Sequence, residues 1–348
     1  MTPYFMEYYG NPSGHYEYGE TSKKAIEQVR RTIADSLGAQ PEEIYFTAGG
    51  TESDNWALHG MADLHPGGHI ITTQIEHHAI LHTCEYLEKK GMRVTYLPVD
   101  EKGMISLDQL EDAICEETCM ISVMFANNDI GKIATKYNIC FHTDAVQAYM
   151  HLRINVHDMA ISMLSASAHK FGGPKGVGFL YIRKDQPIRA FMHGGSQERH
   201  MRSGTENVPG IVGMGKAVEL GMKHGKEEAA YVKKLRNDTI KKLFREIPYL
   251  RLNGDFHHRL PGNINISFQF VEAQSLLVLL DMQGICASAG SACTSGDKGI
   301  SHVLQAIHLR EDLARGTLRF TLGADNTPEE MEELVKQLKL LVNDLRSF

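Results

Sequence analysis

Short apolar segments alternate with helix-like segments through the first half of this sequence, and this alternation restricts the folds that the chain can adopt. The strand-like segments are residues 44–47, 70–73, 94–99, 120–125, 139–144, 161–164 and 177–182. Helical patterns lie between several of them, at residues 56–61, 79–87 and 108–115. Strands that alternate with helices indicate a mostly parallel sheet with helices on both faces. We therefore expect an α/β fold.

Residues that are able to do chemistry follow several of the expected strands. They are Gly50, Thr51, His77, Asn128, Asp144, Gln147, Ser167, His169 and Lys170. In a sheet of this kind the ligand lies at the carboxyl ends of the strands. One shared site accounts for these positions better than a series of separate coincidences.

The turn Gly49-Gly50-Thr51 joins an expected strand to an expected helix. Free backbone N–H groups and the positive end of the helix dipole meet at such a turn, so it can bind an anion such as a phosphate. The sequence is neither G-x-G-x-x-G nor a P-loop, and a nucleotide is not the first expectation. Turns of this kind also occur without any ligand.

Lys170 stands beside His169 in a segment that contains four glycines, at 172, 173, 176 and 178. Glycine lets a bound group approach the backbone closely. A lysine in this position can react with an aldehyde if its amine is deprotonated. The alternative is an ordinary glycine-rich hairpin with a solvated lysine.

Four features together match the needs of pyridoxal 5′-phosphate. Asp144 can pair with a protonated ring nitrogen, and His77 can stack on a flat ring. Lys170 can bind the aldehyde, and the glycine turn with Ser167 can hold the phosphate. Each residue also has a simpler interpretation, because His77 can be a surface or capping residue and Asp144 a turn former.

Length and composition indicate a two-domain protein of the cytoplasm. A chain of 348 residues exceeds what one hydrophobic core usually serves, and we expect domains at 1–233 and 234–348. The net charge of −7 argues against a nucleic-acid partner. The sequence shows neither a signal peptide nor an apolar window long enough to span a membrane. Its six cysteines form no C-x-x-C pair, so we expect no metal site.

The second half contains two further reactive side chains. Cys293 lies among small polar residues and glycines, with Lys298 near it in sequence. A thiol exposed in such a loop can act as a nucleophile, although an incidental surface cysteine is the alternative. Arg319 falls on an expected strand and suits a substrate carboxylate.

Several helix boundaries can also be predicted. Ser22 is expected to cap a helix that ends near Gly38. Two successive helices are expected at 211–224 and 226–244. Thr327 and Glu330 form a capping box with Pro328 at the first helical position, and this box is expected to begin the last helix.

Segments throughout the chain resemble the NifS-type cysteine desulfurases, which are pyridoxal-phosphate enzymes of the class V aminotransferase group. The similar segments are EYYGNPSG, TAGGTESDN, IEHHAI, NNDIG, FHTDAVQA, SASAHKFGGPKGVG, RSGTENVPG, GSACTSG followed by SHVL, and LRFTLG. The GSACTSG loop resembles the long-loop subgroup that serves iron–sulfur assembly. The resemblance implies a fold-type I, aspartate aminotransferase-like homodimer, whose large domain holds a seven-stranded sheet and whose smaller α+β domain carries the cysteine loop.

The resemblance also implies a role for each candidate residue. Lys170 would hold the cofactor and move protons, while His77 would stack on the ring and Cys293 would take the sulfur of L-cysteine as a persulfide. The other cofactor contacts would be Gly50, Thr51, Asp144, Gln147, Ser167 and His169, with Thr205 from the partner subunit. Asn128 and Arg319 would bind the substrate carboxylate. The persulfide sulfur would pass to an acceptor or iron–sulfur scaffold protein, with which Cys293 would transiently share a cluster.

The chain departs from the family pattern in two places. Family members carry a D-N-A-A-T-T-like strand before the segment EYYGNPSG, whereas this sequence starts at Met1. Family members also have additional residues after NNDIG, so we expect the helix that follows Gly131 to be shortened. Two alternatives stay open besides a cysteine desulfurase, and the departures favour the second of them. One is a selenocysteine lyase or another class V enzyme, and the other is a truncated, non-catalytic paralogue that binds a sulfur-acceptor partner.

Overall fold

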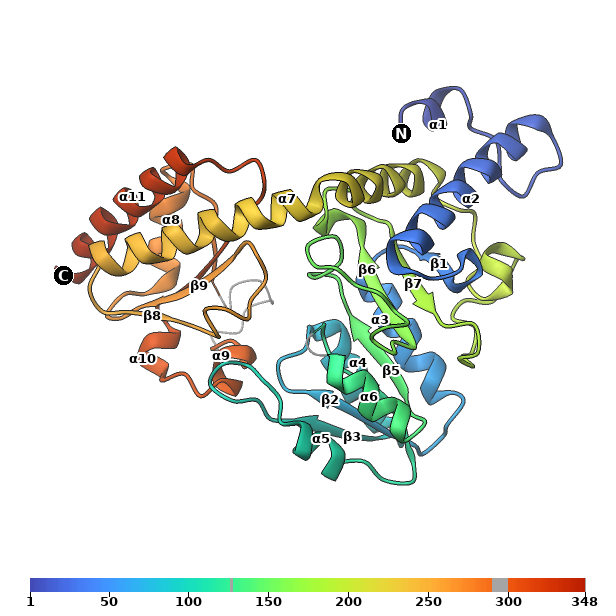
Figure 1. The fold of residues 1–348 in the computed structure, drawn as a ribbon, viewed down its shortest axis with the longest axis horizontal. Coiled ribbons are helices and arrows are strands. Elements are labelled where there is room, and N and C mark those ends of the chain that lie inside the picture. The colour runs from blue at the N-terminus through green and yellow to red at the C-terminus, as the bar shows by residue number, and fades with distance from the viewer. Residues whose placement is uncertain (126–127, 290–299, 348) are drawn as a thin grey trace. The chain divides into compact units, whose positions relative to one another are not determined.

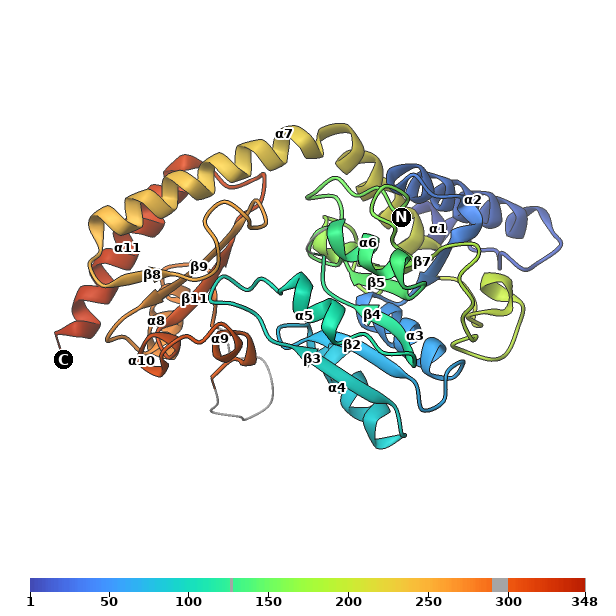
Figure 2. The same cartoon turned by 60° about the horizontal axis from the view of Figure 1, so that its bottom comes forward.

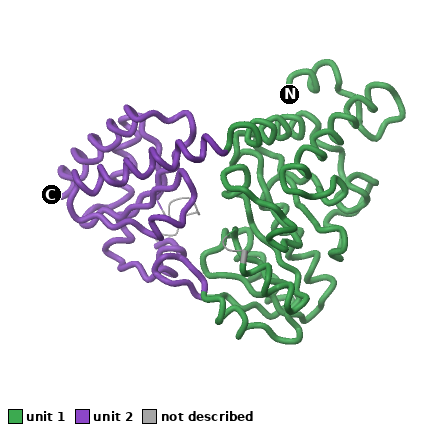
Figure 3. The backbone as a smooth tube through the Cα atoms, in the orientation of Figure 1, with its two compact units in different colours: residues 1–97, 106–225 green, residues 98–105, 226–348 purple. Residues whose placement is uncertain are grey.

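The computed structural model describes residues 1–125, 128–289 and 300–347. The chain forms two compact units, one of residues 1–97 and 106–225 and the other of residues 98–105 and 226–348 (Figure 3). The boundary at 225 falls inside helix α7 (Val208–Glu246). The sequence-based division between residues 233 and 234 falls in the same helix and stays a prediction.

A seven-stranded, mostly parallel sheet forms the centre of the first unit, as the alternation of segments predicts (Figure 1). The strand order is β1-β7-β6-β5-β4-β2-β3, and only β7 runs antiparallel to its neighbours. The strands are β1 (Ile44–Thr47), β2 (His69–Thr73), β3 (Arg93–Leu97), β4 (Thr118–Ser122), β5 (Cys140–Asp144), β6 (Met163–Ser167) and β7 (Gly178–Ile182). Strands β2, β6 and β7 are buried along their whole length, as is typical of a parallel sheet that is covered on both faces.

The first unit also contains helices. They are α1 (Pro3–Met6), α2 (Glu17–Leu37), α3 (Gly50–Ala62), α4 (His78–Lys89), α5 (Leu107–Asp112) and α6 (Asn128–Lys136), together with the short 3₁₀ helices η1 (Pro41–Glu43), η2 (Ala168–Lys170) and η3 (Gln197–His200). Helix α3 buries Trp56, Leu58 and Met61 against the sheet. Packing of this apolar face fixes the start of α3, where Gly50 and Thr51 lie.

The predicted cap of α2 is wrong, although the end of this helix is predicted correctly. Gly38 ends α2 with a φ of 70°, a conformation that favours glycine. At the other end the helix begins at Glu17, so Ser22 lies inside it. The hydroxyl of Ser22 donates a hydrogen bond to the carbonyl of Tyr8 and packs the preceding segment against α2. The helix can start earlier because Glu17 and Glu20 provide acidic side chains in its first turn.

The order of the strands predicts where a ligand binds. From β2 the chain moves outward to β3, then returns to the other side of β2 to form β4. At such a switch point the connections diverge and leave room at the carboxyl ends of the strands. The connections that follow β2 and β4 therefore border this space, at the edge of the sheet where the candidate residues are expected.

The second unit has a four-stranded antiparallel sheet in the order β10-β11-β9-β8. Its elements are β8 (Leu250–Leu252), β9 (Asn263–Phe268), α8 (Ala273–Asp281), β10 (Ser288–Ala289), α9 (His302–Ala306), α10 (Glu311–Ala314), β11 (Thr317–Thr321) and α11 (Pro328–Arg346). Figure 2 shows α8 and α11 beside this sheet. The predicted capping box is confirmed, because the Thr327 hydroxyl accepts from the N–H of Glu330 and the Glu330 carboxylate accepts from the N–H of Thr327.

The prediction of two helices around residue 225 is wrong, because α7 is one helix of 39 residues. A glycine inside a helix costs only about 1 kcal/mol relative to alanine. Packing on both sides offsets that cost, since Met214 and Val218 are buried in the first unit and Leu235 and Leu243 in the second.

Within the described residues, no helix combines the length and the apolar character that crossing a membrane requires.

Candidate active site

The structure places most of the predicted site residues at the carboxyl edge of the large sheet. Gly50 and Thr51 begin α3 after β1, His77 follows β2, Asp144 ends β5, and Lys170 lies in η2 directly after β6. These strands all run in the same direction, so their carboxyl ends share one edge. These positions therefore lie along one edge of the sheet, and their joining in one site stays a prediction.

The glycine turn forms a cradle against Ser167. Gly49 has φ 151° and ψ −178°, a conformation that essentially only glycine adopts. A Cβ atom at Gly49 would lie 3.5 Å from the Ser167 hydroxyl oxygen, and one at Gly50 would lie 2.5 Å from Cγ2 of Val146. The Ser167 hydroxyl is hydrogen-bonded to Nδ1 of His169 at 3.0 Å. The first N–H groups of α3 have no partner within the helix, and together with Ser167 they suit a phosphate.

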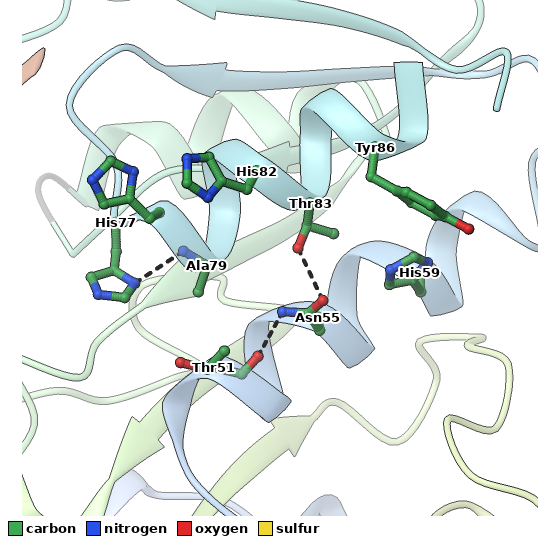
Figure 4. A pocket seen from close by; sticks show the side chains of 9 residues that line it. Thr51, Asn55, His59, His77, Ala79, His82, Thr83 and Tyr86 are labelled. Atoms are coloured by element: carbon green, nitrogen blue, oxygen red, sulfur yellow. Dashed lines mark hydrogen bonds between the residues drawn. The ribbon is translucent and has the colours of Figure 1, made fainter. Parts of the chain in front are cut away.

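His77 is the N-cap of α4, which agrees with the simpler of its two predicted roles. Its Nδ1 accepts a hydrogen bond from the N–H of Ala79 at 3.1 Å (Figure 4). The imidazole remains exposed, and the capping bond fixes its orientation. A groove of about 640 Å³ runs from Thr51 and His77 along α3 and α4. The same ring can therefore cap the helix and present a face to a ligand.

Asp144 also forms a local bond, because its Oδ1 accepts from the N–H of Val146 at 2.8 Å. Burial raises the pKa of Asp144, while the Val146 bond and the positive charges of His77 and Lys170 lower it. The carboxyl group thus senses both cationic side chains. An acid, an imidazole and a lysine lie close enough to interact, as the binding of a pyridine ring with an aldehyde requires.

Lys170 and His169 lie on the η2 turn, and both side chains are exposed. The carbonyl of Lys170 is hydrogen-bonded to Nε2 of His151 at 2.9 Å, which anchors the turn. Burial lowers the pKa of His169, and the positive charges of Lys170 and Lys175 lower it further. A neutral imidazole remains next to Ser167, and the lysine amine is accessible to an aldehyde.

Five other predicted site residues stay predictions. Cys293 lies outside the described residues, and Asn128 is the first residue of α6. Gln147 is exposed in the turn after β5, and Thr205 is exposed before α7. Arg319 is exposed on β11 of the second unit. Helix α6 has nine residues and contains Gly131, and the expected shortening stays a prediction.

The structure adds polar residues that the sequence analysis did not identify. Arg202 binds both carboxylate oxygens of Glu52, at 2.8 and 3.1 Å, next to Thr51. Asp54, Glu76 and His142 are buried beneath the site. The sequence contains a signal for two of them, because Asp54 follows Gly50 by one helical turn and His142 alternates with Asp144 along β5.

These residues fit pyridoxal 5′-phosphate, since a cradle for the phosphate, a half-buried acid, an oriented imidazole and an accessible lysine lie at one edge. The fold and this constellation define a fold-type I, pyridoxal-phosphate-dependent enzyme. The model of the class-V aminotransferase family matches residues 1–334. The chain belongs to this family and, within it, to the NifS-type cysteine desulfurases.

Three comparisons support this assignment. The chain is 50% identical to the cysteine desulfurase IscS of Methanosarcina thermophila, over all of this chain and 89% of the relative. It superimposes on a solved NifS-like protein with a TM-score of 0.92 and 36% identity, covering 99% of this chain and 94% of the other. The structure of SspA in complex with cysteine gives a TM-score of 0.81 and 37% identity, covering 93% and 94% of the two chains.

Proposed function

We propose that this chain converts L-cysteine to L-alanine and a persulfide on Cys293, and that the sulfur then passes to an acceptor for iron–sulfur cluster assembly. The observation that carries the proposal is the meeting of Asp144, His77 and Lys170 at the edge beside the glycine cradle. The similarity to cysteine desulfurases and to a protein solved with cysteine supports L-cysteine as the substrate.

The residues of the first unit would hold the cofactor. The N–H groups of Gly50 and Thr51, with the side chains of Ser167 and His169, would bind its phosphate. Asp144 would pair with the ring nitrogen, Gln147 would bind the phenolic oxygen, and His77 would stack on the ring. When bound, pyridoxal phosphate supplies an electron sink for the substrate carbon. The amine of Lys170 would bind the aldehyde and later carry protons.

The substrate and the sulfur would be handled by the remaining residues. Asn128 and Arg319 would bind the carboxylate of L-cysteine. The Cys293 thiolate would form a bond to the substrate sulfur as the carbon–sulfur bond breaks. The electron pair of the broken bond stays with carbon, which takes up a proton and yields alanine. The reaction is balanced without an external oxidant.

The partners and the location are inferred rather than observed. We expect a homodimer in which Thr205 reaches the cofactor of the partner subunit, and the exposure of Thr205 supports this role. Transfer of the persulfide sulfur requires a protein that accepts it, and the resemblance to the long-loop subgroup favours an iron–sulfur scaffold. A cytoplasmic location stays a prediction.

Two variants test the proposed function. In the wild-type protein, added pyridoxal phosphate should give the visible absorbance of a lysine-bound cofactor, and L-cysteine should change this absorbance and yield alanine. Lys170→Ala should lose the absorbance, while Cys293→Ser should keep it and lose alanine formation. Cofactor binding without alanine would instead favour another substrate, such as selenocysteine. Failure to bind the cofactor would favour the non-catalytic paralogue.

A further inference from the structure

A row of polar side chains lies on one face of the large sheet, beneath the candidate site. His142 and Asp144 are two residues apart on β5 and therefore point to the same face. Ser122 on β4 is paired with His142, and Ser165 on β6 is paired with Asp144. Paired residues in adjacent strands share a face, so all four side chains lie on one side of the sheet.

Asp54 approaches this row from helix α3, four residues beyond Gly50. Nδ1 of His142 is hydrogen-bonded to the Ser122 hydroxyl at 2.9 Å, and its Nε2 to the Ser165 hydroxyl at 3.0 Å. Oδ1 of Asp54 lies 3.8 Å from the same Nε2. Asp54 is 1% exposed, and its Oδ1 has no hydrogen-bond partner among the residues that the structure describes. An unsatisfied carboxylate oxygen in such a place is costly, whereas a neutral acid is tolerated.

The charged groups around Asp54 also favour its neutral form. The carboxyls that face it are Asp144 on β5 and Glu76 before α4. Burial raises the pKa of Asp54 well above its ordinary value, repulsion from Asp144 raises it further, and a hydrogen bond with Ser165 opposes these effects. Burial lowers the pKa of His142 to about 3, so this neighbour is neutral and offers no compensating charge.

Asp144 differs from Asp54 because two positively charged side chains act on it. His77 and Lys170 both lower the pKa of Asp144. Two neighbouring carboxyls that repel each other do not both ionise readily, and the one nearer the cations takes the charge. The negative charge of the pair is therefore placed where a protonated ring nitrogen would be bound.

We propose that Asp54 is a positioning residue for Asp144. Asp54 stays a neutral acid, holds Ser165 and His142 under the site, and leaves the negative charge to Asp144. The proposal rests on the assignment of Asp144 to the cofactor ring. It assigns a task to Asp54 that is separate from holding the phosphate or the substrate.

The holoenzyme variants Asp54→Ala and Asp54→Asn test this role, with Thr143→Val as the matched control. Thr143 is buried on the same strand and points to the opposite face. The readout is the acid limb of the pH titration of the cofactor absorbance, together with the ¹⁵N chemical shift of the labelled ring nitrogen. Asp54→Ala should admit water beside Asp144 and move the acid limb by roughly one pH unit to lower pH. The acid limb of Asp54→Asn and that of Thr143→Val should both stay at the wild-type position.

Two results would overturn the proposal. An unchanged acid limb in Asp54→Ala would mean that Asp54 does not act on Asp144. A shift of equal size in Asp54→Asn would mean that Asp54 carries charge. If Asp54→Ala does not fold, the infrared difference spectrum between wild type and Asp54→Asn at neutral pH still tests whether Asp54 is protonated. It should show the C=O stretch of a protonated acid, and carboxylate bands would contradict the proposal. The infrared experiment works on the protein without cofactor, so it is independent of the proposed function.

Discussion

The guanidinium of Arg30 contacts both carboxylate oxygens of Glu198 at 2.8 Å, and both side chains are buried. Arg30 comes from α2 and Glu198 from η3, far apart in the sequence. Glu198, Arg199 and His200 have φ values of 43°, 57° and 65°. Such values cost of order 1–3 kcal/mol per residue outside glycine. The ion pair and a hydrogen bond from the N–H of Phe46 hold this strained turn in place.

Breaking this pair from one side should destabilise the first unit strongly. Glu198→Ala removes the bidentate partner of the buried Arg30 and leaves it only the more exposed Glu27. We expect a loss of about 3–5 kcal/mol in the free energy of unfolding, measured in urea. The double variant Arg30→Met with Glu198→Leu should recover most of that loss. As a control, Asp312→Ala removes an exposed ion pair with Arg310 and should cause no measurable change. Equal effects of the two alanine variants would contradict the argument.

Arg202 and Glu52 should control the affinity for the cofactor. Glu52 lies in the first turn of α3 beside Thr51, and Arg202 neutralises it through two hydrogen bonds. Arg202→Met leaves a free negative charge near the phosphate cradle, so we expect about tenfold weaker binding of pyridoxal phosphate, which corresponds to about 1.4 kcal/mol. Glu52→Gln removes that charge and should restore the affinity in the double variant. A double variant that binds no better than Arg202→Met would contradict this explanation.

The sequence was sufficient to predict the sheet and the edge that carries the site. Strand positions follow from continuous apolar runs, and the cradle follows from a glycine turn between a strand and a helix. Helix ends were less predictable where tertiary contacts decide them. Ser22 has the side chain of a cap, but its hydroxyl bonds to Tyr8, and α7 continues through Gly225 because both of its halves are packed.

The polar residues beneath the site could not be assigned from the sequence alone. The segment 194–207 is rich in polar residues, yet Glu198 and Ser203 are buried in it. Glu198 is buried only because Arg30 lies opposite to it in the fold. Asp54 likewise gains its environment from strands that lie far from it in sequence. Such pairings depend on strand order and register, which no local pattern contains.

Glu76 should make stability depend on pH. Burial raises its pKa to about 8, while hydrogen bonds from the N–H of Met124 and the hydroxyl of Thr73 oppose this. An unfolded glutamate has a pKa of about 4.3, so between these values the folded state holds a proton that the unfolded state has released. The stabilisation is complete below the unfolded pKa and is lost as the pH rises towards the folded value.

The variant Glu76→Gln should remove this dependence. The difference in unfolding free energy between wild type and variant should change by a few kcal/mol from acidic to mildly alkaline pH, with wild type losing stability as the pH rises. Urea unfolding of the protein without cofactor, at a series of pH values, measures this difference. Parallel profiles for the two proteins would show that Glu76 is already ionised in the fold.

Gly49 in the cradle should tolerate substitution poorly because of its backbone conformation. Its backbone conformation is nearly restricted to glycine, while a Cβ atom would meet only the Ser167 hydroxyl at 3.5 Å. The cost of Gly49→Ala is therefore conformational rather than steric, and we expect a loss of about 1–3 kcal/mol in unfolding free energy. Relief of the strain would move the turn away from Ser167, so the affinity for pyridoxal phosphate should fall as well. Gly323→Ala is the control, because its Cβ would meet no atom within 4 Å and its φ is not positive. A Gly49→Ala variant as stable as this control would show that the turn can change its conformation freely, and the cradle would then not be pre-formed.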